Sequence, residues 1–345
     1  MTRPDQATGD GPSQPFSNTI PHQTDHQSLY SNGASTITQP QSKATAAVDA
    51  PPSRPQHHTF PDVCYKLRHK VQAFLADEIP ASDELLRNVQ NQVRASVNVI
   101  DEALRRYSFD QVSLSYNGGK DCLVLLILIL ACLPTCNDPT GEKTCTIALA
   151  SPAPAPTPTV PTALKPIDGS SSASAPLRSF QAIYIVPPDL FPEVDEFVDQ
   201  STADYQLDLA RYPMAMRAAL DAYLADRPAV QAIFMGTRRT DPHAEFLAHF
   251  NPTDPGWPQL MRIHPVINWH YAEIWAFIRH FDIPFCSLYN QGFTSLGGTT
   301  DTRPNPVLAK TKANTGDNSG SSTPTSFRPA YELLDDDEER LGRGR

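Results

Sequence analysis

A three-layer α/β fold built on a parallel β-sheet is predicted by three features of the sequence. Strand-like and helix-like segments alternate from residue 111 to residue 281, which is the order of a parallel sheet with crossover helices. Residues 122–133 are apolar on every side, as expected of a helix buried against such a sheet. A pair of glycines at 118–119 separates the first strand from this helix, which is typical of a tight turn.

Two helices are predicted ahead of the first strand. Apolar residues recur at helical spacing in the segments 63–74 and 85–104. Ser82 stands shortly before the second segment and is a favourable N-cap residue. We therefore expect a pair of N-terminal helices packed on the core.

The remaining elements follow in alternation along the chain. The strand at 230–235 leads directly into the turn Gly236–Pro242, and the helix at 269–281 carries an apolar face. The expected strands are 111–116, 180–186, 206–209, 230–235 and an extended segment at 261–267; the expected helices are 122–133, 191–200, 214–224 and 269–281.

Three segments have a composition that cannot build a core. Residues 1–55 are rich in Thr, Ser, Gln, Pro and Asn, and residues 135–178 contain the runs SPAPAPTPTVP and DGSSSASAP. Residues 301–326 are similar in composition, and the chain of 345 residues holds 34 prolines in all. We expect one folded domain at 56–300 with a flexible insertion at 135–178, a disordered linker at 301–326, and a separate C-terminal segment at 327–345.

Charge and cysteine usage exclude several classes of protein. A net charge of −10 argues against a general nucleic-acid-binding protein, which needs a basic surface. The six cysteines form no CxxC pair, so neither a zinc ribbon nor a thioredoxin-type site is indicated. The N-terminus lacks the apolar core of a secretory signal, and the longest apolar run is shorter than the ~20 residues that span a bilayer. We expect a cytoplasmic monomer that acts on small molecules, with neither a nucleic-acid nor a membrane partner.

The glycine turn has the residue types of a phosphate-binding site. Adjacent glycines allow the backbone to approach an anion, and the helix that follows directs its N-terminal N–H groups and its dipole at the same point. Asn117 can donate a side-chain N–H to phosphate, and Asp121 can hold Mg²⁺ against phosphate oxygens. The segment is neither a Walker A loop nor a GxGxxG loop. The turn alone leaves open a strand-to-helix connection that needs only flexible residues.

Several segments in order resemble one family of enzymes. Residues 116–122, YNGGKDC, resemble the pyrophosphate-binding loop SGGxDS of the adenine-nucleotide α-hydrolase-like superfamily. Asn117 and Cys122 replace the first and last Ser of that pattern. The loop with these two replacements resembles that of the eukaryotic FAD synthases (FMN adenylyltransferases) of the sulfonucleotide-reductase-like group, particularly the fungal ones. Similar to the same family are GTRRTDP at 236–242, WPQLMRIHP at 257–265, IPFCSLY at 283–289, GFTSLG at 292–297 and RLGR at 340–343, where Leu341 replaces the family's Ala.

The resemblance implies a modified Rossmann fold and a reaction. AMP would pass from ATP to the phosphate of FMN, giving FAD and pyrophosphate with the assistance of Mg²⁺. A phosphate monoester with a second pKa of about 6 is mostly dianionic at neutral pH, so its attack needs no general base. The reaction needs positioning and charge neutralisation, which arginines and metal-bound carboxylates supply. The C-terminal segment 327–345 would dock on the domain and bring its arginines to the site.

The resemblance also implies the role of individual residues. ATP would contact Ser115, Tyr116, Asn117, Gly118, Gly119, Lys120 and Asp121, with Mg²⁺ at Asp121. The flavin would contact Arg238, Thr240, Asp241, Asp254, Trp257 and Arg262. The implied catalytic residues are Asn117, Asp121, Asp241, Arg340 and Arg343.

Simpler interpretations stay open for some of these residues. Asp241 and Asp254 each precede a proline and suit a turn, and Arg238 suits plain surface charge. The acidic run at 335–339 is expected to be solvated rather than to bind a metal. The aromatic residues of the 269–281 helix are expected in the core, whereas Trp257, in a proline-rich loop, is the better candidate for stacking on a flavin.

Other classes of protein share the glycine turn. A sulfonucleotide reductase would need a reactive cysteine near its C-terminus, but the last cysteine, Cys286, stands in an apolar setting. A tRNA-thiolating enzyme would need CxxC pairs and a basic surface. A non-catalytic adenine-nucleotide-binding regulator remains the alternative from a different class, although Asp121, Asp241, Arg262 and Arg343 are all present.

Overall fold

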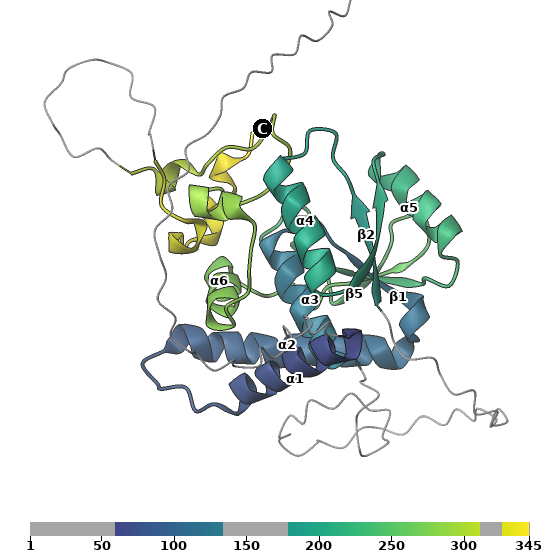
Figure 1. Ribbon diagram of the computed structural model, residues 1–345, viewed down its shortest axis with the longest axis horizontal. Helices are drawn as coiled ribbons and strands as arrows, with labels where there is room; N and C mark the ends of the chain where they lie inside the picture. Colours follow the sequence, from purple (N-terminus) through teal and green to yellow (C-terminus); the bar gives the residue numbers. More distant parts are fainter. Residues whose placement is uncertain (1–58, 134–178, 311–325, 345) are drawn as a thin grey trace, which may run out of the picture. The chain divides into compact units, whose positions relative to one another are not determined.

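A six-stranded sheet in the order β3-β2-β1-β4-β6-β5 forms the centre of the molecule (Figure 1). The structure, a computed structural model, describes residues 59–133, 179–310 and 326–344. Within them, every neighbouring pair of strands is parallel except β5 with β6 at one edge. The strands are β1 (Val112–Ser115), β2 (Phe180–Ile185), β3 (Leu207–Tyr212), β4 (Ala232–Met235), β5 (Phe250–Pro252) and β6 (Met261–Ile263).

Helices cover both faces of this sheet (Figure 1). α3 (Lys120–Cys132) lies against one face and is buried along almost its whole length, which explains why its sequence is apolar on all sides. On that side also lie α1 (Phe60–Ala76), α2 (Glu84–Arg106), α4 (Pro192–Asp204) and α6 (Tyr271–His280), and α5 (Met216–Asp226) covers the other face. The predicted three-layer α/β sheet with two N-terminal helices is confirmed. None of the helices in the described ranges is both long and apolar enough to cross a membrane.

The alternation of side chains along β2 shows how the two layers of core arise. Phe180, Ala182 and Tyr184 belong to the large core on the α3 side, whereas Ile183 packs in the smaller core under α5. Successive side chains of a strand point to opposite faces, so a strand covered on both faces is mostly apolar. The polar exception in β2 is Gln181, whose side-chain amide donates to the carbonyls of Asp110 and Val112. The large side chains of this strand therefore give the sheet its helices on both sides.

The structure adds one strand that was not predicted and corrects one predicted N-cap. β5 was not predicted, because it is only three residues long, ends in Pro252 and carries no apolar alternation. The N-cap of α2 is Asp83, whose carboxylate accepts the Leu86 N–H at 3.1 Å, and not Ser82. The other predicted helices and strands agree with the structure to within a few residues at their ends.

Residues 301–310 are ordered, so the prediction of a disordered linker is wrong for them. Thr302, Asn305 and Leu308 are buried, and a short 3-10 helix spans Pro306–Leu308. Residues 301–310 are mostly small and polar, as in a linker, but their polar groups form hydrogen bonds within the protein. The side chain of Asn305, for example, donates to Thr294 and to the carbonyl of Glu338. The predicted disordered segments 1–55 and 135–178, and the rest of the linker, 311–325, lie outside the described residues.

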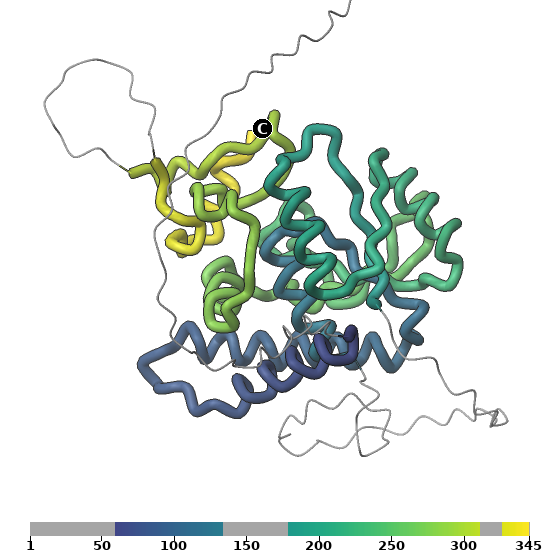
Figure 2. The backbone as a smooth tube through the Cα atoms, viewed as in Figure 1, coloured from purple at the N-terminus to yellow at the C-terminus, as the bar shows by residue number. Residues whose placement is uncertain are grey.

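The segment 326–344 lies along the segment that follows α6 (Figure 2). The backbone N–H of Arg328 donates to the carbonyl of Leu308 at 2.7 Å, and the N–H of Arg303 donates to that of Gly342 at 2.9 Å. Thr302 and Arg343 form an isolated antiparallel bridge. These bonds bring the last described residues to the same part of the molecule as the glycine turn.

We expect the substitution Leu126→Ala to lower the free energy of unfolding by about 2–5 kcal/mol, because it leaves a cavity in a fully buried helix. Leu334→Ala is the matched control: that side chain is 74% exposed, so the change should stay within about 0.5 kcal/mol. Urea unfolding of both variants and the parent measures the difference. Similar losses in the two variants would contradict the burial of α3.

Candidate active site

The glycine turn joins the end of β1 to the first turn of α3. Gly118 has φ +71°, and a Cβ added to it would lie 2.8 Å from the side chain of Val198, so the position requires glycine. The side-chain oxygen of Asn117 accepts the N–H of Gly119 at 2.9 Å. Asn117 is exposed, and α3 begins directly after Gly119. The turn thus has an exposed amide beside a helix N-terminus, which is the geometry of an anion site.

The neighbouring Tyr116 and Lys120 are turned into the protein. Tyr116 is 1% exposed, and its hydroxyl donates to Ser201 Oγ at 2.7 Å. The backbone N–H of Lys120 donates to the hydroxyl of the buried Tyr289 at 2.9 Å. The Lys120 ammonium group is enclosed as well, with its side chain 2% exposed. The side chains of both residues therefore support the turn from inside, although the sequence pattern assigned them to the nucleotide.

Five charged residues form a buried ion cluster beneath the turn: Lys120, Asp121, Arg238, Asp336 and Glu339. The Lys120 Nζ lies 3.0 Å from Asp121 Oδ2 and 2.5 Å from Glu339 Oε1. Burial acts to lower the pKa of Lys120, but these two carboxylates together outweigh it and raise the pKa. Lys120 is therefore charged, and its charge is neutralised inside the protein.

Arg238 is the second cation of the ion cluster and is fully buried. Its Nη1 donates to Asp336 at 3.0 Å, its Nη2 donates to Glu339, and its Nε lies 2.7 Å from Asp121. The last contact has ion-pair distance without hydrogen-bond geometry. Arg238 was assigned to the flavin from its motif, with surface charge as the simpler alternative. The structure instead places it in the ion cluster.

Asp121 and Asp241 are two half-buried carboxylates whose pKa values are shifted in opposite directions. Burial acts to raise the pKa of Asp121, but Arg238 and Lys120 outweigh it and hold the pKa below its usual value. The pKa of Asp241 is raised by burial and by the nearby charge of Asp121. Asp241 accepts the N–H of Arg238 at 2.8 Å, so the turn after β4 uses its side chain, as the simpler interpretation expected. Thr240, which precedes Asp241 in the sequence, is exposed.

The side chains around the turn do not form a resident metal site. Both carboxylate oxygens of Asp121 already contact cations, and one oxygen of Asp241 accepts a backbone N–H. Across the described residues, no group of three or more His, Cys, Asp and Glu side chains is placed to hold a metal ion. Mg²⁺ usually keeps only one or two protein carboxylates when substrate phosphates supply the other ligands. Asp121, to which the resemblance assigned Mg²⁺, has both of its carboxylate oxygens engaged inside the protein.

Arg343 is held by the loop that follows α6. Its Nη1 donates to Thr302 Oγ1 at 2.8 Å and its Nη2 to Asp301 at 3.0 Å. A Cβ added to Gly297 would coincide with the guanidinium group of Arg343, so only glycine leaves space for it. The carbonyl of Arg340 accepts the backbone N–H of Arg343 at 2.9 Å, and the Arg340 side chain is exposed. The loop therefore orients Arg343 before any ligand binds.

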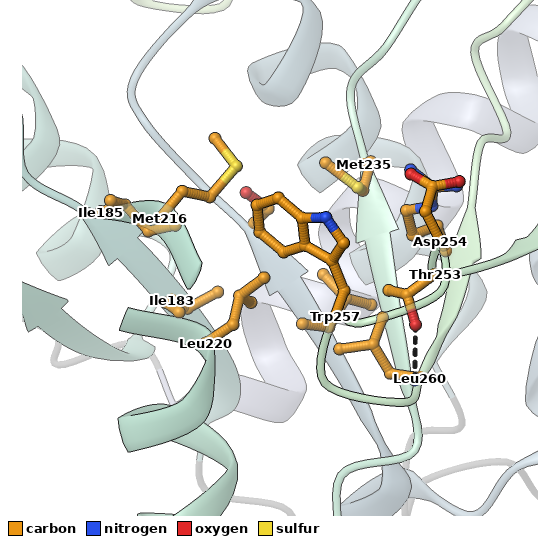
Figure 3. Close-up of a pocket in the computed structure, with 12 residues that line it drawn as sticks. Ile183, Ile185, Met216, Leu220, Met235, Thr253, Asp254, Trp257 and Leu260 are labelled. Carbon is orange, nitrogen blue, oxygen red and sulfur yellow. Dashed lines mark hydrogen bonds and ion pairs between the residues drawn. The ribbon is translucent and has the colours of Figure 1, made fainter. Parts of the chain in front are cut away.

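A second part of the site is an apolar pocket on the α5 side of the sheet. Ser115, Ile183 and Met235 stand at one level, because the register pairs Ser115 with each of the other two. Figure 3 shows the Trp257 side chain between Met216 and Met235, with Asp254 at the rim. Arg262 lies 3.4 Å from Asp254. The pocket is lined by Ser115, Ile183, Ile185, Met216, Leu220, Ile233, Met235, Thr253, Asp254, Trp257, Leu260 and Arg262.

The structure brings together Asp254, Trp257 and Arg262 as the sequence predicted, and it adds Ser115 to their pocket. The backbone carbonyl of Asp254 accepts the N–H of Trp257 at 3.1 Å in a turn where Gly256 has φ +85°, so the carboxylate of Asp254 stays available at the pocket. Asp254 therefore makes the turn and also stands at the pocket. The Trp257 ring is half-buried, as a stacking surface must be.

Comparison with known proteins identifies the family. The phosphoadenosine phosphosulfate reductase domain family matches residues 111–222 and 214–304. The chain is 33% identical to "Probable FAD synthase" of Schizosaccharomyces pombe over 263 residues, covering 76% of this chain and 83% of the relative. It is 30% identical to flavin adenine dinucleotide synthase of Saccharomyces cerevisiae, covering 73% and 77%. The chain belongs to the FAD synthase family.

A solved structure supports the same placement. The FMN adenylyltransferase of Candida glabrata, crystallised with FMN and the ATP analogue AMPCPP, matches with a TM-score of 0.66 and 26% identity. The match covers 84% of this chain and 98% of the other. The sequence resemblance to eukaryotic FAD synthases is confirmed.

The sequence did not reveal the residues that support the glycine turn from inside the protein. Glu339 is 5% exposed and Asp336 is part of the ion cluster, so the expectation of a solvated acidic run at 335–339 is wrong for both. Tyr289 and Gly297 were seen only as letters of a motif. A run of carboxylates carries no signal in the sequence for a partner two hundred residues away.

We expect the substitution Tyr289→Phe to lower the free energy of unfolding by about 1–3 kcal/mol, because it leaves the buried N–H of Lys120 without an acceptor. Tyr65→Phe is the control, since Tyr65 is 56% exposed and should tolerate the loss of its hydroxyl. Guanidinium unfolding at neutral pH measures both variants. An unchanged midpoint for Tyr289→Phe would show that its hydroxyl does not support the turn.

Proposed function

We propose that this protein is an FMN adenylyltransferase, which transfers AMP from ATP to the phosphate of FMN and releases pyrophosphate. One observation carries the proposal: an apolar pocket and an anion-binding turn meet at the end of β1. Ser115 lines the pocket, and the exposed amide of Asn117 stands two residues further on. The apolar pocket suits a flat apolar ring that carries a phosphate, and the glycine turn suits a polyphosphate.

The proposed mechanism is direct displacement at the α-phosphorus of ATP. An oxygen of the FMN phosphate forms the new P–O bond while the bond from the α-phosphorus to the bridging oxygen breaks, and pyrophosphate leaves with that electron pair. No side chain needs to remove a proton, because the attacking phosphate is dianionic at neutral pH. The catalytic task is to align the two substrates and to neutralise charge on the leaving group.

The chain supplies three groups for this task. The side-chain NH₂ group of Asn117 offers donors to the polyphosphate at the turn, and the dipole at the N-terminus of α3 favours its negative charge. Arg343, already oriented by Asp301 and Thr302, offers a guanidinium to the transferred or departing phosphate, with Arg340 beside it. Mg²⁺ is proposed to enter with ATP, and the negative charges of Asp241 and Asp121 near the turn would attract it. Bound in this way, Mg²⁺ would screen the charge of the polyphosphate.

The flavin is proposed to bind in the pocket against Trp257. Ile183, Leu220 and Met235 give the ring an apolar floor, and the rim carries the opposite charges of Asp254 and Arg262. Such a rim can hydrogen-bond the polar edge of the ring system while the apolar faces are buried. Of the residues that the resemblance assigned to the flavin, Arg238, Thr240 and Asp241 do not line this pocket, and Arg238 is engaged in the ion cluster. The proposed flavin contacts are therefore those of Asp254, Trp257 and Arg262.

The described cysteines disfavour the reductase alternative. Burial raises the pKa of the Cys122 thiol to about 12, and burial likewise raises the pKa of Cys286. A thiol that stays protonated at neutral pH is a poor nucleophile. Cys122 and Cys286 are free thiols, as they would stay in the cytoplasm, which we propose as the location of the enzyme. We further propose that it acts as a monomer on small molecules, without a nucleic-acid or membrane partner.

Incubation of the full chain with ATP, MgCl₂ and FMN tests the proposal. We expect FAD and pyrophosphate to appear in equal amounts, as chromatography and a coupled pyrophosphate assay would measure. A regulator that binds without turnover would give neither product. Folded protein that yields no FAD under these conditions contradicts the proposed function.

The substitution Trp257→Ala tests the flavin pocket separately. We expect it to raise the KM for FMN roughly tenfold, because the lost aromatic contact is worth about one kcal/mol or more. The KM for ATP should not change. Phe246→Ala removes an aromatic side chain that is 88% exposed on the preceding connection, between β4 and β5, and it should leave both constants unaltered. A parallel rise of both KM values in Trp257→Ala would place Trp257 outside the flavin pocket.

A further inference from the structure

Glu339 connects the C-terminal segment to the glycine turn through its side chain. Its Oε1 lies 2.5 Å from Lys120 Nζ, and its Oε2 accepts a hydrogen bond from Arg238 Nη2. Its backbone carbonyl accepts the hydroxyl of Thr294. We propose that Glu339 is a positioning residue for adenylyl transfer, because its carboxylate fixes where Arg340 and Arg343 stand. This inference rests on the proposed function and adds a residue to it.

The charges of the ion cluster explain why the carboxylate must stay. Lys120 and Arg238 are two cations with almost no exposure, and Asp121 can balance only one of them. Asp336 reaches Arg238 but is also shared with the backbone N–H of Tyr271, at 2.7 Å. Removing one partner of a buried ion pair leaves an uncompensated charge, which is far less favourable than the intact pair. Glu339 therefore holds the segment in place as long as both cations remain buried.

A single short turn connects Glu339 to the arginines. The 3-10 helix Asp336–Gly342 contains Glu339 and Arg340, and the N–H of Arg343 donates to the carbonyl of Arg340 at 2.9 Å. At its far end, Arg343 is bonded to Asp301 and Thr302. The turn is thus fixed at both ends, by the ion cluster at one and by the loop at the other. Releasing the Glu339 end lets Arg340 shift and strains the bonds of Arg343.

The two acidic residues of the ion cluster that come from this segment have different tasks. Asp336 accepts the first N–H of α6 and lies 2.6 Å from His270, so it attaches the start of the turn to α6. Glu339 alone reaches under the glycine turn to Lys120. Asp337, between them, is exposed. Asp337 therefore provides a matched control with the same type of charge in the same turn.

The substitution Glu339→Gln removes the charge and keeps the size of the side chain. We expect kcat to fall about tenfold to a hundredfold, the range expected when a catalytic group is displaced by about 1 Å. The KM for FMN should not change, because Glu339 is not in the flavin pocket. Asp337→Asn should leave kcat as in the parent. Steady-state kinetics on the full chain with MgATP and FMN measures all three proteins.

A double-variant cycle separates positioning from a general structural defect. If Glu339 acts through Arg343, Glu339→Gln should lower kcat much less in an Arg343→Ala background than in the parent. An equal fall in both backgrounds overturns the proposal, and so does an unchanged kcat in the single variant. In both of these cases the parent still makes FAD, whereas a parent that makes none overturns the proposed function instead.

A second variant covers the case in which Glu339→Gln does not fold. Glu339→Asp keeps the charge and shortens the side chain by one methylene, so it should fold and draw the turn toward the ion cluster. We expect a lower kcat with an unchanged KM for FMN, and faster tryptic cleavage after Arg340 than in Asp337→Asn. If neither Glu339 variant folds, Glu339 is a residue of stability rather than of positioning, and the proposal is overturned.

Discussion

Two buried cations, Lys120 and Arg238, are the constraint on which the rest of the site depends. A cation removed from water needs a carboxylate at hydrogen-bonding distance, because its lost hydration is otherwise uncompensated. The glycine turn supplies one carboxylate, Asp121, and the C-terminal segment supplies Asp336 and Glu339. The turn and the segment are therefore parts of one unit, and the loop at 292–308 completes it by holding the segment from the other side.

Local periodicity made most of the fold predictable, and the same locality explains what was missed. α2 and α3 have long stretches with apolar residues at helical spacing or throughout, and β1, β2 and β4 are short, mostly apolar runs. Each of these elements can therefore be assigned as helix or strand from its own residues. β5 has no such pattern. Residues 301–310 are ordered by side-chain hydrogen bonds such as that from Asn305 to the carbonyl of Glu338, which composition does not reveal.

The candidate site divides in the same way. Asp254, Trp257 and Arg262 lie within nine positions of one another, and a motif captured them as a set. Their partners Ile183 and Met235 come from β2 and β4 and meet because β1 lies between these two strands in the sheet. A third partner, Met216, comes from α5, which covers this face. The family resemblance assigned Lys120 to ATP. Its true partner, Glu339, is 219 positions away, so no local pattern could identify the pair.

That separation also bears on how the protein is made. Synthesis proceeds from the N-terminus, so α3 and the sheet can form while the residues around Glu339 are still inside the ribosome. Until those residues emerge, Lys120 and Arg238 lack two of the three carboxylates that balance them. Contacts of such long sequence separation form late in folding because they close the largest loops. The centre of the sheet can thus be complete on a nascent chain whose active site does not yet exist.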